Sequence, residues 1–143
     1  MSRKIAREVA FKIIFSNEFE QDSLKDLIED IVSDSELVET TNKNDISSED
    51  KKYIEQVVLG IAEKKDELDE KIKAYLKGWT MDRISKTDLA ILRLAVYEML
   101  YREDIPCKVS INEAVELAKA FCEETSPAFI NGVLAGVVNS LEN

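Results

Sequence analysis

Apolar residues recur at helical spacing along almost the whole chain. In the first half they repeat every three or four positions, which places them on one side of an α-helix. This pattern predicts helices over residues 2–16, 23–38, 47–65 and 68–76, the last of them ended by Gly78. Residues 39–46 are almost entirely polar, so we expect a loop there.

The second half contains the strongest periodic segment, residues 86–102, which ends before Pro106. Two further helices are expected over residues 110–122 and 126–141. The chain has only 4 Gly and 2 Pro, few for a β-sandwich or an α/β fold, and it shows no convincing strand. The pattern therefore predicts an all-α protein of seven helices.

Two of the expected helix starts carry the pattern of a capping box, in full or nearly so. In a capping box, a Ser hydroxyl accepts the backbone N–H three residues on, and an acidic or amide side chain there reaches back. Ser47 and Asp50 nearly fit this motif, and Ser110-Ile-Asn-Glu113 fits it fully. We therefore expect helices to begin beside Ser47 and Ser110.

A chain of 143 residues suffices for one compact domain or two small subdomains that share a core. We divide it into an N-terminal bundle, residues 1–78, and a C-terminal bundle, residues 79–143, within one compact unit. Trp79 begins the connector, where a lone Trp is most often an interface plug, with a binding role as the alternative. For Arg93 and Glu98, inside the most apolar helix, we expect a structural ion pair or cap.

Charge is distributed unevenly along the chain, whose net charge is −10. Residues 1–15 carry a local charge of +3, whereas residues 16–50 carry −10. The acidity is therefore concentrated in one stretch, and the N-terminus is an isolated basic segment that could attract phosphates.

Catalysis finds little support in the residue types. The chain has no histidine, the commonest general base and metal ligand, and no phosphate-binding Gly-rich loop. Cys107 and Cys122 lack metal-site spacing and are expected to be reduced thiols, which favours the cytoplasm. We expect no cofactor, no metal, no export signal and no membrane span. The chain is thus predicted to bind partners and not to be an enzyme.

The first helix combines cations with aromatic rings. A helical projection places Ile5, Ala6, Val9 and Ile13 on a core arc. The opposite arc holds Arg3, Lys4, Arg7, Phe11 and Phe15. Cations that meet phosphates and rings that stack on bases are typical of single-stranded nucleic-acid binding. The alternative is that both Phe side chains pack against neighbouring helices and the cations form a solvated face.

Three segments of the second half occur in the order and spacing of one known family. They are Leu92-Arg-Leu-Ala-Val-Tyr-Glu98, Val109-Ser-Ile-Asn-Glu-Ala-Val-Glu-Leu-Ala-Lys119 and Phe129-Ile-Asn-Gly-Val-Leu134. Together with the basic start Arg3-Lys-Ile-Ala-Arg-Glu8, they resemble the NusB family of bacterial transcription antitermination factors. NusB-like domains also occur fused to ribosomal RNA methyltransferases, but this chain has no room for a methyltransferase domain.

The resemblance implies two three-helix bundles packed together, with the first helix joined to the N-terminal one. It also implies that the protein pairs with NusE, a protein of the small ribosomal subunit, and that the pair binds the boxA element of nascent RNA. This complex would help RNA polymerase read through terminators, notably in ribosomal RNA operons. No cofactor is implied.

Site residues carry over from the resemblance one by one. Arg3, Lys4 and Arg7 match the RNA-contacting basic segment. Phe15 stands where relatives often have Tyr, so stacking is kept and a hydroxyl contact is lost. Phe129 matches an aromatic residue near the RNA path.

The resemblance also suggests residues of the partner surface, and two positions differ from the family pattern. Asp88 matches an acidic position facing NusE, and Asp82 is a weaker candidate nearby. Thr125 and Ala135 stand where relatives often have Asp, which affects local contacts only. A helical protein-interaction module without RNA affinity is the alternative function, and a homodimer is possible.

Overall fold

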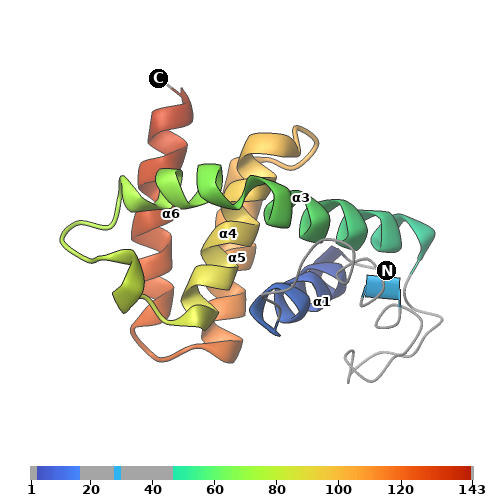
Figure 1. Ribbon diagram of the computed structural model, residues 1–143, viewed down its shortest axis with the longest axis horizontal. Helices are drawn as coiled ribbons and strands as arrows, with labels where there is room; N and C mark the ends of the chain where they lie inside the picture. Colours follow the sequence, from blue (N-terminus) through green and yellow to red (C-terminus); the bar gives the residue numbers. More distant parts are fainter. Residues whose placement is uncertain (1–2, 17–27, 30–46, 143) are drawn as a thin grey trace. The chain divides into compact units, whose positions relative to one another are not determined.

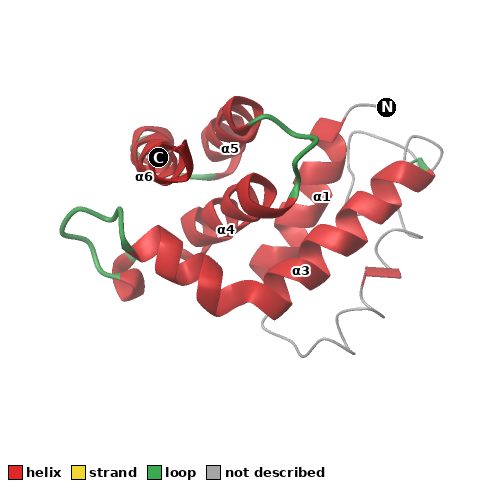
Figure 2. Ribbon diagram, turned by 90° about the horizontal axis from the view of Figure 1, so that it is seen from above, coloured by secondary structure: helices red, strands yellow, loops and turns green. Residues whose placement is uncertain are grey.

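The computed structural model describes residues 3–16, 28–29 and 47–142. These ranges contain helices joined by loops and no strand (Figures 1 and 2). The α-helices with described bounds are α1 (Arg3–Ser16), α3 (Ser48–Lys73), α4 (Lys86–Tyr101), α5 (Cys107–Phe121) and α6 (Ser126–Glu142). A short 3-10 helix, η3 (Met81–Arg83), precedes α4. In these ranges no helix is long and apolar enough to cross a membrane. The all-α prediction is confirmed for this part of the chain.

The prediction of seven helices is wrong, because five α-helices have bounds in the described ranges. The helices expected over residues 47–65 and 68–76 form one helix, α3, of 26 residues. The two expected segments meet at residues 65–68, Lys-Asp-Glu-Leu. None of these residues breaks a helix, so the helix continues through them. The helix expected over residues 23–38 lies outside the described residues, apart from positions 28 and 29.

The chain forms two compact units, Met1–Glu63 and Lys64–Asn143, each described here by itself. Our division at residue 78 stays a prediction. The described core of the first unit consists of Ile28 and apolar side chains from α1 and the first half of α3. The Arg3 guanidinium carbon lies 4.9 Å from the Tyr53 ring centroid. The most buried of these side chains are Val9, Ala10, Ile13, Ile54 and Val57.

The start of α3 confirms the capping motif expected at Ser47. Its hydroxyl accepts the backbone N–H of Asp50 at 3.1 Å, and the Asp50 carboxylate accepts the Ser47 backbone N–H at 3.4 Å. Two N–H groups at the helix start are thereby satisfied.

In the second unit α4, α5 and α6 pack against one another pairwise, as expected of a C-terminal three-helix bundle (Figure 1). Their inward faces are apolar, so burial of these stripes drives the packing. Core residues with at most 3% exposure include Ile91, Leu92, Val96, Ala118, Ile130 and Leu134.

The second half of α3 is joined to α4 by polar contacts. Arg93 donates to both carboxylate oxygens of Asp69, from Nε at 2.8 Å and Nη2 at 2.9 Å. Tyr101, at the end of α4, donates its hydroxyl hydrogen to Glu67. The structural ion pair expected for Arg93 is therefore confirmed.

The capping box predicted at Ser110 is wrong. Helix α5 begins at Cys107, after Pro106 at the N-cap, so Ser110 already lies within the helix. The Ser110 hydroxyl instead donates to Glu98 Oε1 at 2.7 Å, and both side chains are buried. A buried carboxylate needs such a donor, and this contact between α4 and α5 accounts for the polar residue in the most apolar helix.

We expect Leu92→Ala to lower the free energy of unfolding by about 2–5 kcal/mol, because it leaves a cavity in the bundle core. Leu92 is fully buried, whereas Leu141 on α6 is 38% exposed. Leu141→Ala, the matched control, should stay within about 0.5 kcal/mol of the parent. Urea unfolding of both variants checks this, and equal losses would refute the assigned core.

Candidate functional site

The predicted basic segment lies on α1, and its three cations differ in exposure. Lys4 is exposed, Arg3 is half-buried with its guanidinium on the Tyr53 ring, and Arg7 is 5% exposed. Lys12, one turn further, forms an ion pair with Glu8 at 3.2 Å. Of the three cations predicted to contact RNA, Lys4 is the one with an exposed side chain.

The expected division of α1 into a core arc and an exposed arc is wrong at Arg7 and Phe11. Both side chains are buried, as are Ala6, Val9, Ala10 and Ile13. The buried face is therefore wider than the predicted core arc of Ile5, Ala6, Val9 and Ile13. The alternative of a packed Phe holds for Phe11, and the predicted RNA contact of Arg7 stays a prediction for a side chain that is buried here.

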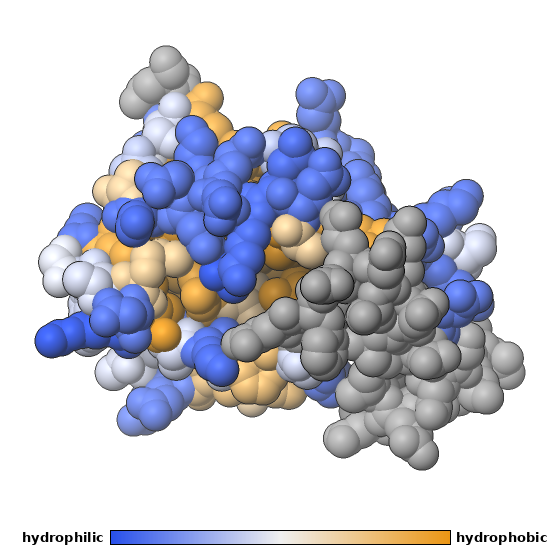
Figure 3. All heavy atoms as spheres, viewed as in Figure 1, coloured by the Kyte–Doolittle hydropathy of each residue, from blue (hydrophilic) through white to orange (hydrophobic). Residues whose placement is uncertain are grey.

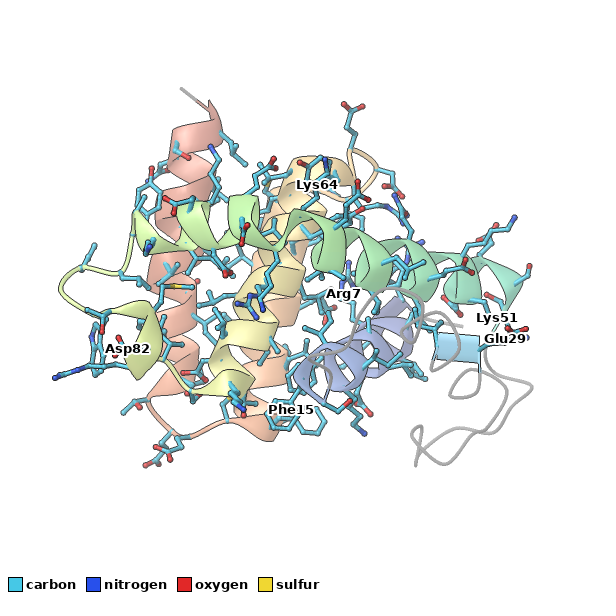
Figure 4. The ribbon with its side chains drawn as sticks, viewed as in Figure 1. Arg7, Phe15, Glu29, Lys51, Lys64 and Asp82 are labelled. Carbon is cyan, nitrogen blue, oxygen red and sulfur yellow. The ribbon has the colours of Figure 1, made fainter. Side chains whose placement is uncertain are left out.

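Phe15 is exposed, as predicted for the side of α1 opposite the core arc. Its side chain is 46% exposed near the end of α1 (Figure 4). Its ring stacks on the buried Phe11 ring, with centroids 6.2 Å apart and an angle of 27° between the planes. Phe11 thus holds the inner edge of a ring whose outer part remains available for stacking on a base.

The two predicted partner-binding acids lie in different surroundings. Asp82 is exposed in η3 (Figure 4), whereas Asp88, in the first turn of α4, is 9% exposed. Asp88 Oδ2 accepts the Ser126 hydroxyl at 3.1 Å, and Asp88 Oδ1 is buried without a hydrogen-bond partner among the described residues. The backbone N–H of Asp88 donates to the N-cap hydroxyl of Ser85.

A pocket of about 520 Å³ lies within the second unit, between the segment that follows α3 and the start of α6. Its wall includes Trp79, Arg83, Asp88, Phe121 and Phe129. Phe129, a predicted RNA contact, is half-buried, and its ring meets the Trp79 ring edge-on with centroids 6.3 Å apart. The pocket therefore brings Phe129 and Asp88, predicted for different roles, to one place.

Trp79 does not form the interface plug that was expected of it. Its side chain is 55% exposed, and Phe121 in the same pocket is 40% exposed. Other hydrophobic residues also reach the surface between hydrophilic ones on the face drawn in Figure 3. Two residues with positive φ, Lys77 at 51° and Gly78 at 94°, turn the chain just before Trp79. The sequence analysis assigned no role to Arg83 or Phe121. The one sequence feature that could have pointed to Arg83 is its position four residues after Trp79.

Cys122 also lines this pocket, and its thiol is held in the protonated form. Burial is the main cause that raises its pKa from 9.0 to about 12, followed by the neighbouring Asp88 carboxylate, which favours the protonated thiol. The Ser126 hydroxyl acts in the opposite direction. Among the described residues no group of His, Cys, Asp and Glu side chains could hold a metal ion.

Comparison with known proteins places this geometry in context. The sequence profile of the NusB family matches residues 4–139. A transcription antitermination protein NusB of Bacillus pumilus (strain SAFR-032) is 52% identical over 90 residues, which are 63% of this chain and 69% of that protein.

Two solved structures share the fold. T. maritima NusB is similar with a TM-score of 0.79 and 33% identity, over 97% of this chain and 92% of that one. A chain from the crystal structure of antitermination factors NusB and NusE in complex with double-stranded RNA gives a TM-score of 0.75 over 96% of both chains. Its identity of 23% supports likeness of fold alone.

We expect alkylation of Cys122 to be slow and to rise with pH without a plateau between about pH 8 and about pH 10, because the thiolate is the nucleophile. A Cys107→Ser variant isolates Cys122 for a timed iodoacetamide reaction. Asp88→Asn should speed the reaction, since it removes the negative charge that raises the thiol pKa. A plateau near pH 9 would contradict the raised pKa.

Proposed function

The chain belongs to the NusB family, and on this ground we propose that it binds the boxA element of nascent RNA together with NusE. The family consists of transcription antitermination proteins and not of enzymes. In this proposal the complex helps RNA polymerase read through terminators in ribosomal RNA operons, in the bacterial cytoplasm. The observation that carries it is the family match over almost the whole chain.

A structural relative supports the choice of RNA and NusE as partners. That relative was crystallised as antitermination factors NusB and NusE in complex with double-stranded RNA. The present chain shares the fold of the matched chain over 96% of its length. The common fold makes the same two partners the first to test here.

Helix α1 supports RNA binding on physical grounds. It lies in a segment with a local charge of +3, residues 1–15, of a chain with net charge −10, and this local positive charge attracts phosphates. Lys4 offers an exposed ammonium group, and Phe15 offers an exposed ring on a fixed base, Phe11. One supplies attraction to phosphates and the other a platform for a base.

The acidic surface supports a basic protein partner. Asp82 is exposed and forms no ion pair among those found in the described residues, so a cationic side chain of a ribosomal protein could approach it. Complementary charge mainly speeds encounter and fixes orientation. The role proposed for Asp88 is less direct, because its carboxylate is buried and accepts from Ser126.

Phe15→Ala should weaken binding of single-stranded boxA RNA by about 1–3 kcal/mol, through loss of base stacking. Phe15→Tyr keeps the ring and serves as the control. Fluorescence anisotropy with labelled RNA measures both affinities, and an unchanged affinity for the Ala variant would remove Phe15 from the site.

Lys4→Gln should weaken RNA binding and flatten the dependence of log affinity on log salt by about 0.7, the value of one lost phosphate contact on a single strand. Lys51→Gln, on the exposed face of α3 (Figure 4), is the matched control and should leave the slope unchanged. Equal slopes for all three proteins would argue against α1 as the phosphate-binding segment. A complete lack of RNA affinity without NusE would favour the protein-interaction module instead.

Asp82→Lys should weaken NusE binding severalfold and leave the unfolding midpoint unchanged, because an exposed side chain is reversed in charge. Glu103→Lys makes the same charge change at another exposed position and controls for net charge. Titration calorimetry with purified NusE provides the readout. If both variants lose affinity equally, net charge and not an Asp82 contact determines binding.

A further inference from the structure

Gly132 and Gly136 both lie inside the 17-residue helix α6, where glycine is less favourable than alanine because it loses more backbone freedom on folding. In the described part of the chain, and its own helix backbone aside, a Cβ atom at Gly132 would meet nothing within 4 Å. At Gly136 it would lie 2.4 Å from Cδ1, 2.8 Å from Cγ and 3.1 Å from Cβ of Tyr75. Two of these atoms are next to the Tyr75 main chain, so the ring could not simply turn aside. Gly136 therefore allows a close approach that a side chain would block.

Tyr75 belongs to the segment by which the chain leaves α3. The backbone N–H groups of Tyr75 and Trp79 donate to the carbonyls of Ile72 and Leu76, at 3.0 Å and 3.3 Å. The Ile72 and Leu76 side chains are buried, so these hydrogen bonds connect the segment to the core. Tyr75 itself is half-buried, and its side chain lies against α6 at Gly136.

Helix α6 holds the same segment at a second point. Phe129 lies seven residues before Gly136, which is about two helical turns, so the two residues lie on one side of α6. The Phe129 ring meets the Trp79 ring edge-on, with centroids 6.3 Å apart. The segment after α3 thus runs beside α6 (Figure 1), which contacts Tyr75 before the turn with positive φ and Trp79 after it.

The short helix η3 follows directly and depends on its neighbours for its position, because none of its side chains is buried. On one side, Ser85 caps α4. On the other, the carbonyl of Thr80, the residue after Trp79, accepts the backbone N–H of Arg83 at 3.0 Å. The place of Asp82, exposed in η3 (Figure 4), therefore depends on how α6 holds the preceding segment.

We propose that Gly136 is a positioning residue for Asp82 in NusE binding. By admitting the Tyr75 side chain, Gly136 lets α6 hold the segment from which η3 leaves, so that the Asp82 carboxylate is in place before the partner arrives. A contact that is formed in advance costs less ordering on binding. The inference rests on the proposed function, in which Asp82 contacts NusE, and it adds a residue that acts through Tyr75.

Gly136→Ala should disturb this arrangement, and Gly132→Ala is the matched control in the same helix. Because alanine favours a helix interior, Gly132→Ala should raise the thermal midpoint by roughly 2–4 °C, whereas Gly136→Ala should show no such gain. The chain has a single tryptophan, so its near-UV circular dichroism reports on the packing of Trp79. That signal should weaken in Gly136→Ala and stay parent-like in Gly132→Ala.

Titration calorimetry with NusE, well below the thermal midpoints, separates positioning from stability, because a merely structural role would leave the affinity of the folded protein unchanged. Gly136→Ala should weaken NusE binding severalfold, since only molecules that keep η3 in place can bind. Gly132→Ala should bind like the parent.

Tyr75 variants test whether Gly136 acts through that side chain. Tyr75→Ala removes the two atoms nearest to Gly136 and should itself weaken NusE binding, whereas Tyr75→Phe keeps the ring and should bind like the parent. Adding Gly136→Ala to Tyr75→Ala should then change the affinity little, because the clash has been removed. An equal loss from Gly136→Ala with and without Tyr75→Ala would overturn the proposal.

The other outcomes are also decisive. A parent-like tryptophan signal in Gly136→Ala would overturn the proposal. Parent-like NusE affinity for Gly136→Ala, beside weakened binding of Asp82→Lys, would overturn it and leave the proposed function intact. A parent protein that does not bind NusE would overturn both. If Gly136→Ala fails to fold, equal NusE affinities of Tyr75→Ala and Tyr75→Phe would overturn the proposal, and a loss confined to Tyr75→Ala would support it.

Discussion

The paired hydrogen bonds between Arg93 and Asp69 hold the second half of α3 against α4. Because the guanidinium and the carboxylate meet through two parallel contacts, the pair fixes orientation as well as distance. Tyr101 and Glu67 repeat the connection at the far end of α4. The position of α3 in turn sets where the chain leaves it at Lys73, and so where the turn before Trp79 places that side chain beside α6. The pocket of the second unit depends on this chain of contacts.

Local patterns predicted local structure well. The stripes of α4, α5 and α6 and the cap at Ser47 were all visible as spacing, since each depends on residues within one helix. One prediction that failed involves a partner distant in sequence. Ser110 has the form of a cap but bonds to Glu98, 12 residues away. The start of α5 is set by Pro106 instead.

In the candidate site, too, local features were predicted and the surroundings of each side chain were not. The aromatic and basic character of α1 was readable, but which of its rings is exposed was not: Phe11 and Phe15 lie four residues apart and share a face, yet one is buried and the other is exposed. Whether a ring is buried depends on the side chains that pack on it from other parts of the chain, and a helical projection shows one helix only. Likewise Trp79 is typical of an interface plug by residue type alone. Its exposure and its contact with Phe129 follow from the turn at Lys77 and Gly78 and from the position of α6.

We propose that this acidic helical member of the NusB family binds RNA through a few exposed cations and rings, and that NusE strengthens that binding. The most direct measurement is a titration of labelled boxA RNA with this protein, with and without NusE, beside an RNA of the same composition in shuffled order. The account predicts measurable binding of boxA RNA by the protein alone, tighter binding with NusE, and weaker binding of the shuffled RNA in both cases. Equal affinities for the two RNAs, or no RNA bound with NusE present, would contradict it.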